Sequence, residues 1–361
     1  MSPFQLFNLP LVPLSIVLNS MSLPQLIKVA LTSKRSYRIS KFLSSKITEK
    51  FKIYINNFIT IEFENWEIEG NVMFHVFESS EIKENFEIEF LKIRDTVIKI
   101  QKNEEDDSLH VYWDNDRFVG LQFVSNILTD FFDSSIHRLA ILDQNRKDDP
   151  RKVIDWLMNR QKTLPFCYFE CQKTSDEDLK YFLDTCRVSE ELTLVVKTSE
   201  HFQYSFKYPM ELRRVAITGW PALMNLYELN CELLWMNTRN FSNQDINSFL
   251  NNWMNGGNSI MKFLYLRVKQ FDLQSILNGF EVVARRFPNP LLFNWFDGRP
   301  LYFNYGMEIR RESDGKVALI RMYEDGSFKM YVWPDWKGLP YPLDDPNQYS
   351  LENTLIIMEN E

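Results

Sequence analysis

Cysteine and histidine are the residues best able to hold a metal or act as nucleophiles, and the chain has four of each. Cys167 and Cys171 are spaced closely enough to share a metal. However, no second pair lies nearby and their segment resembles an apolar strand, so buried, small hydrophobic residues are the favoured interpretation. The four histidines are scattered singly, and a triad or metal cage would need long-range assembly: His75, His110, His137 and His201. We therefore expect no metal and no cofactor.

Spaced catalytic motifs are also missing from the sequence. It has no Gly-x-x-x-x-Gly-Lys-Ser/Thr, no Gly-x-Gly-x-x-Gly, no His-Glu-x-x-His and no Gly-x-Ser-x-Gly. The acidic run at residues 104–107 is interpreted as a solvated loop rather than a metal site. The sequence therefore predicts a protein without catalytic activity of its own.

Composition and charge indicate a folded protein with a boundary near residue 50. The chain has 29 Phe, 15 Tyr and 9 Trp among 361 residues, and because each aromatic side chain buries about 150–250 Å², thick packed sheets are expected. Residues 1–50 carry seven Lys and Arg against one acid, although the whole chain has a net charge of −8. A small basic module thus precedes a larger acidic part. Such a module more often serves an acidic protein partner than nucleic acid, and no nucleic acid is expected.

The compartment is inferred from the cysteines and the apolar segments. The N-terminal stretch has no basic residue before Lys28 and is broken by prolines, which makes it a poor secretory signal. No apolar run of about 18 residues occurs, so no membrane association is expected. The cysteines are then interpreted as reduced thiols of a cytoplasmic or nuclear protein.

Three short helices are predicted in the first 50 residues. Pro13 suits the first position of a helix, and an apolar face follows at i, i+3, i+4 and i+7: Leu14, Val17, Leu18 and Met21. A second helix starts after Ser22 as N-cap and carries its stripe over residues 23–31. A third, basic helix is expected over residues 34–50, with three side chains facing inward: Tyr37, Phe42 and Ile47.

This N-terminal pattern resembles the F-box, which has a Leu-Pro pair, an amphipathic helix, a second helix and a Ser/Cys-Lys-Arg-x-aromatic turn. The matching parts are Leu9-Pro10, Leu14, Ile16-Val17-Leu18, residues 23–31 and Ser33-Lys34-Arg35-Ser36-Tyr37. The resemblance implies binding to a Skp-type adaptor, and through it to a cullin ligase, by Leu9, Pro10, Leu14, Val17, Leu18, Met21, Leu26, Ile27, Leu31 and Lys34. The alternative is an ordinary three-helix cap that buries its apolar stripes against its own domain.

Between residues 51 and 120 the hydrophobic period changes to two, which predicts half-buried antiparallel strands. Apolar and polar residues alternate in two segments, 59–64 and 86–90. Further strands are expected over residues 72–77, 97–100 and 109–113.

From residue 121 onward, predicted helices and strands alternate. Helices are expected over 120–132, 150–160, 176–186 and 243–254, and strands over 136–142, 166–171, 192–197, 212–218, 232–237 and 261–268. The segments that begin at Ser175 and Ser242 are similar, each with an N-cap serine before an amphipathic turn. Successive strands start about 20–30 residues apart, which is typical of a leucine-rich-repeat-like solenoid. A single open α/β sheet is the alternative.

A second resemblance covers about residues 190–280. The segments 231–237, 241–257 and 261–266 resemble the F-box-associated domain of a large nematode-expanded F-box family. In that family the associated region is thought to bind substrate, and no catalytic residues accompany it. Beyond it, Asp314-Gly315 and Asp325-Gly326 predict the turns of a three-stranded β meander.

Together these features predict an α+β or α/β fold in four parts: an F-box at 1–50, an antiparallel β region at 51–120, a leucine-rich-repeat-like substrate-binding region at 121–300, and a β meander with a tail at 301–361. The predicted function is that of the substrate-recognition subunit of a Skp/cullin/F-box ubiquitin ligase. The target protein is not named by the sequence. The alternative is a solenoid protein-binding module with no role in ubiquitination.

Target contacts are expected on the strand at 232–237 and on its neighbour. Alternation predicts burial of Leu233 and Met236, and it places Trp235 and Asn237 on one face. Tyr265 and Arg267 on the next strand are the expected companions of these two. Because aromatic anchors dominate binding energies, Trp235 is the predicted hot spot. The alternative is that Trp235 belongs to the core.

Overall fold

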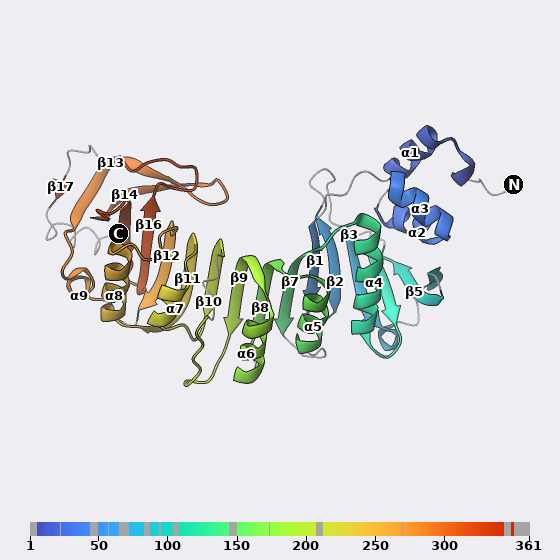
Figure 1. Ribbon diagram of the computed structural model, residues 1–361, viewed down its shortest axis with the longest axis horizontal. Helices are drawn as coiled ribbons and strands as arrows, with labels where there is room; N and C mark the ends of the chain where they lie inside the picture. The colour runs from blue at the N-terminus through green and yellow to red at the C-terminus, as the bar shows by residue number, and fades with distance from the viewer. Residues whose placement is uncertain are drawn as a thin grey trace. The chain divides into compact units, whose positions relative to one another are not determined.

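The computed structural model describes residues 6–21, 23–43, 50–56, 58–64, 72–82, 87–93, 95–103, 108–143, 150–172, 174–206, 212–268, 270–342 and 348–349. The chain forms two compact units, and Figure 1 labels most of their helices and strands. Unit 1 comprises Met1–Cys171 with Thr185–Arg187, and unit 2 comprises Gln172–Asp184 with Val188–Glu361. Each unit combines helices with strands of a mixed sheet, which confirms an α+β fold. The four-part division at residues 50, 120 and 300 stays a prediction.

Unit 1 begins with a short 3₁₀ turn and three helices: η1 (Leu6–Asn8), α1 (Leu11–Ser20), α2 (Leu23–Leu31) and α3 (Lys34–Leu43). Pro13 occupies the third position of α1 rather than the first. This is tolerated because the first N–H groups of a helix have no intrahelical acceptor.

Helix α3 differs from the prediction in its length and in its inward face. It ends at Leu43, and Lys50 already belongs to the first strand. Phe42 is 79% exposed, so its predicted inward orientation is wrong. The small side chains of Ser36 and Ser40, one helical turn apart, are buried instead. Ile47 lies outside the described residues.

The strands of unit 1 form one mixed sheet in the order β4-β5-β6-β3-β2-β1-β7-β8. Their bounds are β1 (Lys50–Ile55), β2 (Ile59–Glu64), β3 (Val72–Glu78), β4 (Glu89–Ile93), β5 (Thr96–Lys102), β6 (Leu109–Trp113), β7 (Ile136–Asp143) and β8 (Leu164–Cys171), with η2 (Ser79–Glu81) after β3. The apolar side chains of β2 alternate toward the core as predicted, and those of β1, a strand that was not predicted, alternate in the same way.

Two features of this sheet correct the expectation of purely antiparallel, half-buried strands. β3 pairs with β6 in parallel, because the turns from β4 to β5 and from β5 to β6 each reverse the chain once, and β1 pairs with β7 in parallel. Phe90 is exposed because it lies in β4, which among the described strands pairs with β5 alone. Phe86 and the acidic run 104–107 lie outside the described residues.

Two helices connect strands of this sheet: α4 (Arg117–Phe132) lies between β6 and β7, and α5 (Pro150–Arg160) lies between β7 and β8. α4 begins three residues before the predicted start, because the carboxylate of Asp116 accepts a hydrogen bond from the backbone N–H of Phe118 (2.9 Å). Gly120 lets α4 approach the sheet, since a Cβ atom there would lie 2.8 Å from Val76 Cγ1. α4 therefore packs closely on the sheet, and its other contacts include helix α3.

In unit 2 the strands follow the order β9-β10-β11-β12-β16-β15-β14-β13-β17. The first four are parallel and every later pairing is antiparallel. The bounds are β9 (Val188–Val196), β10 (Arg214–Thr218), β11 (Leu233–Phe241), β12 (Phe263–Val268), β13 (Val283–Asn294), β14 (Pro300–Arg310), β15 (Val317–Met322), β16 (Ser327–Trp333) and β17 (Gln348–Tyr349).

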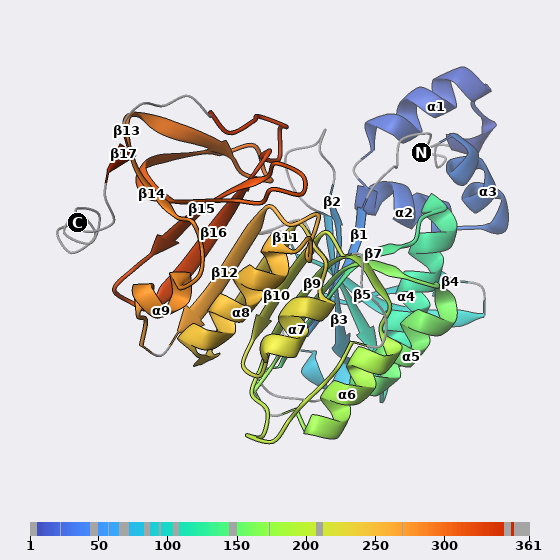
Figure 2. The same cartoon turned by 60° about the vertical axis from the view of Figure 1, so that its left-hand side comes forward.

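The helices of unit 2 are α6 (Asp176–Thr185), α7 (Leu223–Glu228), α8 (Asn243–Met254) and α9 (Leu273–Leu277). Figure 2 shows α7 and α8 covering one face of the parallel strands β10–β12. α6 and α8 share an N-terminal motif, in which a serine hydroxyl accepts the backbone N–H three residues on: Asp178 to Ser175 (3.1 Å) and Asp245 to Ser242 (3.2 Å). The other face of the strands carries the candidate site.

The turn between β14 and β15 gives a prediction for acid stability. Arg311 donates two hydrogen bonds to Asp314 (2.8 and 2.7 Å), and they are the main cause that lowers the pKa of this carboxyl from 3.8 to about 2. A depressed pKa means that the stabilisation by Asp314 is complete above about pH 4 and is lost as the pH falls through about 2. We expect the unfolding free energy of the wild type to fall more steeply over this range than that of Asp314→Asn. Urea denaturation measures both unfolding free energies as a function of pH. The same pH dependence for the wild type and Asp314→Asn would contradict this prediction.

Candidate functional site

Helix α1 turns an apolar surface outward. Leu11, Val12 and Ile16 are 63%, 73% and 66% exposed, although all three are hydrophobic. Leu14 and Leu18, one turn apart on the opposite side, are buried. A helix that is apolar on both faces has one more apolar face than its own bundle needs. The outward group of Leu11, Val12 and Ile16 is called the α1 face below.

The predicted adaptor residues divide into two groups. Four are buried among the described residues of unit 1: Leu14, Leu18, Leu26 and Ile27. The others are half-buried or exposed at the surface: Leu9, Pro10, Val17, Met21, Leu31 and Lys34. The buried group holds the helices together, and adaptor contact by any of the ten stays a prediction. Leu11, Val12 and Ile16 were missed because the 3.6-residue period assigns the apolar face to Leu14 and Leu18.

Lys34 lies at the rim of a cavity of about 690 Å³. Helices α2 and α3 line one side of this cavity, and β4 and α4 line the other. Four cations surround it, and among its described lining residues none is acidic: Lys34, Arg38, Lys41 and Lys92. Lys41 forms an ion pair with Asp130 of α4 (3.4 Å), while the other three form no ion pair with described residues. The N-terminal module therefore has a basic side next to α3.

Helix α3 is fixed to α4 by specific contacts. The Tyr37 hydroxyl donates to Asp130 (2.5 Å), and its ring meets Phe131 edge-on at 5.3 Å. Lys28 of α2 forms an ion pair with Glu89 of β4 (3.0 Å). The N-terminal helices are thereby held in one orientation on the sheet of unit 1, with the buried Leu14 and Leu18 side of α1 turned away from solvent.

The cysteines and histidines do not assemble into a metal site. Among the described residues no group of three or more His, Cys, Asp or Glu could hold a metal ion. None of the four cysteines forms a disulfide with a described residue, and all four are buried. A hydrogen bond with Cys186, together with burial, raises the pKa of the Cys167 thiol, and burial raises that of Cys231. Such thiols stay protonated and unreactive. His75 and His110, far apart in sequence, lie opposite each other on β3 and β6 with ring centroids 5.4 Å apart.

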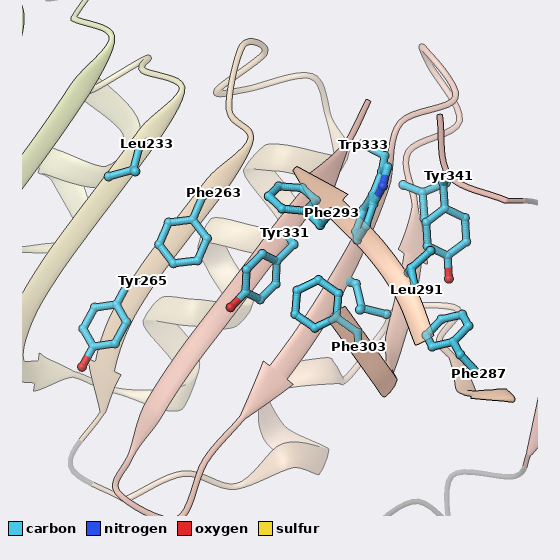
Figure 3. Close-up of a cluster of buried hydrophobic side chains, with 12 residues drawn as sticks. Leu233, Phe263, Tyr265, Phe287, Leu291, Phe293, Phe303, Tyr331, Trp333 and Tyr341 are labelled. Carbon is cyan, nitrogen blue, oxygen red and sulfur yellow. The ribbon is translucent and has the colours of Figure 1, made fainter. Parts of the chain in front are cut away.

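In unit 2, one face of the sheet is lined by aromatic side chains. Figure 3 shows Phe263, Tyr265 and Tyr331 projecting from the same side of β12 and β16, with helices behind the strands. Leu233 of β11 also belongs to this side and is buried in the same cluster, as its predicted burial requires. Met236 is buried on the opposite side, because side chains alternate along a strand. This surface of β11, β12, β15 and β16 is called the aromatic face below.

The structure brings the four predicted target residues together on the aromatic face. Trp235 and Tyr265 are directly opposite on β11 and β12, and their rings stack at 4.0 Å with an interplanar angle of 14°. Trp235 is 37% exposed, which rules out the alternative that it is a core residue, whereas Tyr265 beneath it is buried. Asn237 and Arg267 are half-buried. Contact of these four with a target stays a prediction.

Lys329 and Arg321 complete this surface, although sequence patterns did not reveal them. β16 pairs with β12 and places Lys329 opposite Tyr265, while β15 places Arg321 opposite Lys329. The pairing of β12 with β16 joins segments that the sequence assigned to separate regions, whereas β15 and β16 belong to the same predicted meander. No local periodicity signals such a long-range contact.

The exposure of Trp235 leads to a prediction about stability. Trp235→Ala removes a stacked but partly solvated ring and should lower the unfolding free energy by about 1–2 kcal/mol. Trp253 on α8 is fully buried, and Trp253→Ala should cost about 3–5 kcal/mol. Urea denaturation of both variants measures the difference. Equal losses would mean that Trp235 contributes to packing as a core residue does.

Comparison with known proteins identifies two segments of the chain. A family model described as F-box domain matches residues 6–48, and a model described as F-box associated matches residues 206–266. The first covers α1–α3, and the second includes β10, β11, α8 and most of β12. The chain therefore contains an F-box and an F-box-associated region, as its resemblance to the nematode-expanded F-box family implied.

One curated relative is the Skn-1 dependent zygotic transcript 15 protein of Caenorhabditis elegans. It is 29% identical over an alignment of 112 residues that covers 28% of this chain. The match spans 31% of the length of the relative. No solved structure matches the chain significantly.

The two matched segments indicate a ubiquitin-ligase substrate adaptor in general terms. Proteins with such segments are typically adaptors without catalytic activity. Among the described helices of this chain, none has the length and hydrophobicity that crossing a membrane requires.

Proposed function

We propose that this chain is the substrate-recognition subunit of a Skp/cullin/F-box ubiquitin ligase. Its F-box binds a Skp-type adaptor, and its F-box-associated region binds a target protein. The observation that carries the proposal is the pairing of an F-box match with an outward apolar face on α1. Such a protein needs no catalytic group, because it raises the effective concentration of the target beside the ligase.

The α1 face supports docking of an adaptor. Exposed contiguous apolar side chains mark protein contacts, and Leu11, Val12 and Ile16 have no packing role in the described part of the chain. Leu9 and Pro10 directly precede them in the chain, with Leu9 half-buried and Pro10 exposed. The basic residues beside α3, among them Lys34, would complement an acidic adaptor and increase the association rate.

The parallel strands of unit 2 support target binding. β9, β10, β11 and β12 are adjacent and parallel, and helices connect several of them. The similar capped starts of α6 and α8 are consistent with a leucine-rich-repeat-like arrangement that ends in a β meander. In such an arrangement the strand face opposite the helices is the binding surface. We assign target binding to Trp235, Asn237, Tyr265 and Arg267 on that face.

The reduced, buried cysteines fit a cytoplasmic or nuclear protein, which is the location we propose.

Co-expression of the full chain with a Skp-type adaptor tests the function. The two proteins should elute together in size-exclusion chromatography. Separate elution of two folded proteins would favour a binding module with no role in ubiquitination.

A further inference from the structure

Three cations converge on the aromatic face of unit 2. Trp235, Tyr265, Lys329 and Arg321 form one row across β11, β12, β16 and β15, because each is directly opposite the next. Arg267 lies two residues beyond Tyr265 and therefore on the same face, opposite Ser327. Arg267, Arg321 and Lys329 are called the cationic trio below.

The charge of the trio is poorly balanced within the chain. Arg321 and Lys329 are opposite each other on neighbouring antiparallel strands, where like charges destabilise a sheet. No ion pair joins any of the three to a described residue. The Nε atoms of Arg267 and Arg321 are buried without a hydrogen-bond partner among the described residues. All three residues are half-buried rather than fully buried, so the cationic trio reaches the surface of this face with its charge unpaired among the described residues.

One carboxylate lies close to the trio, but it is already engaged. Asp325 accepts hydrogen bonds from the backbone N–H and the hydroxyl of Ser327, both at 2.9 Å. These bonds are the main cause that lowers the pKa of Asp325, with smaller contributions from Arg267 and Lys329. Burial, and then Arg321, lowers the pKa of Lys329. Among the described residues a single carboxylate lies close to the three cations, so the local charge stays positive.

Aromatic rings hold the cations without neutralising them. The Arg321 guanidinium lies 4.3 Å from the centroid of the Tyr305 ring and 5.3 Å from that of Tyr323. The Lys329 ammonium lies 4.4 Å from the Tyr323 centroid. Cation–π contacts fix the position of a charge but leave its field intact. The partly exposed Trp235 ring adds a flat apolar surface to the same row.

We propose that the cationic trio and Trp235 bind an acidic segment of the target protein. Carboxylates or phosphates of this segment contact Arg267, Arg321 and Lys329, and an apolar or aromatic side chain packs on Trp235. This inference rests on the proposed function, in which unit 2 carries the target site. A peptide segment fits better than nucleic acid, because the net charge of −8 repels a long polyanion whereas three local cations match a few anionic groups.

Fluorescence anisotropy with the full chain and three peptides tests the proposal. One peptide has glutamates on both sides of a phenylalanine, the second has phosphoserines in their place, and the third has glutamines. The acidic peptides should bind about tenfold or more tightly than the glutamine peptide, and added salt should weaken them. The ratio between the first two distinguishes carboxylates from phosphates as the source of the anionic groups.

Charge reversal locates the site. Arg321→Glu with Lys329→Glu should lower the affinity for the acidic peptides by about tenfold or more. The matched control, Lys180→Glu with Lys337→Glu, changes the net charge equally at two exposed positions and should bind like the wild type. If Arg321→Glu with Lys329→Glu lowers the melting temperature, the single change Lys329→Gln replaces it. It removes one charge with little change in volume and should still lower the affinity for the acidic peptides several-fold.

Three results would overturn the inference. They are equal affinity for the acidic and glutamine peptides, unchanged binding by the folded trio variants, and tighter binding of a single-stranded oligonucleotide of equal charge. Adaptor co-elution is measured on the same samples. Retained co-elution without peptide selectivity overturns this inference alone, whereas loss of co-elution by the wild type overturns the proposed function.

Discussion

Replacing Leu11 and Ile16 with aspartate should abolish co-purification of the chain with a Skp-type adaptor. Both side chains are exposed on α1, so the charged residues enter solvent in the free chain and the helix should still form. In a complex, each would place a carboxylate in an apolar contact. Loss of an interface anchor costs about 2 kcal/mol or more, so the pair should weaken binding by about a thousandfold.

Two further variants make the result interpretable. Met224→Asp introduces a charge at an equally exposed apolar position on α7 of unit 2 and should leave adaptor binding intact. Leu18→Asp buries a charge inside the helices of unit 1, and should lose binding together with helical dichroism and melting temperature. If Leu11→Asp with Ile16→Asp still co-purifies with the adaptor at wild-type yield, the α1 face is not the docking surface.

Replacing Arg311 with alanine should destabilise unit 2 more than any surface change. Its guanidinium is buried above the Trp253 ring, 4.6 Å from the centroid. It donates to the carbonyl oxygens of Trp253 (3.0 Å) and Gly257 (3.2 Å) at the end of α8, in addition to its two bonds to Asp314. A cation is favourable at a helix C-terminus. Its removal takes this donor from the Gly257 carbonyl and two bonds from Asp314, while the Trp253 carbonyl keeps the N–H of Gly256 (3.0 Å). We expect a loss of about 3–5 kcal/mol in the unfolding free energy.

Arg310 is the matched control for this prediction. It precedes Arg311 directly, but its side chain is half-exposed and forms one ion pair, with Glu308 (3.2 Å). Arg310→Ala should therefore cost no more than about 1 kcal/mol. Urea denaturation of both variants gives the comparison. Similar losses at the two positions would show that Arg311 does not tie the β14–β15 turn to α8 as its contacts indicate.

Local signals predicted those parts of the fold that depend on neighbouring residues. The helix α8 has the predicted bounds because Ser242 and Asp245 form a reciprocal capping box. α5 likewise has its predicted bounds and begins at Pro150, which is well suited to a first turn. The F-box was recognisable for the same reason, since its features all lie within about forty consecutive residues.

Features that depend on distant partners could not be predicted. Phe42 carries an apolar side chain at a position that α3 leaves in solvent, since Ser36 and Ser40 occupy its inward face. The row from Trp235 to Arg321 needs the antiparallel pairing of β12 with β16, across more than fifty residues of intervening chain. Hydrophobic period determines which face of a strand is buried, but it does not identify the neighbouring strand.

Quantitative mass spectrometry after affinity purification of three tagged full-length chains tests the central claim most directly. The wild type should recover the Skp-type adaptor, a cullin and a set of candidate targets. Leu11→Asp with Ile16→Asp should lose the adaptor and cullin but keep the targets, and Arg321→Glu with Lys329→Glu should keep the adaptor and cullin but lose the targets. Absence of adaptor and cullin from the wild-type sample, with the chain folded and abundant, would contradict the assignment to a ubiquitin ligase.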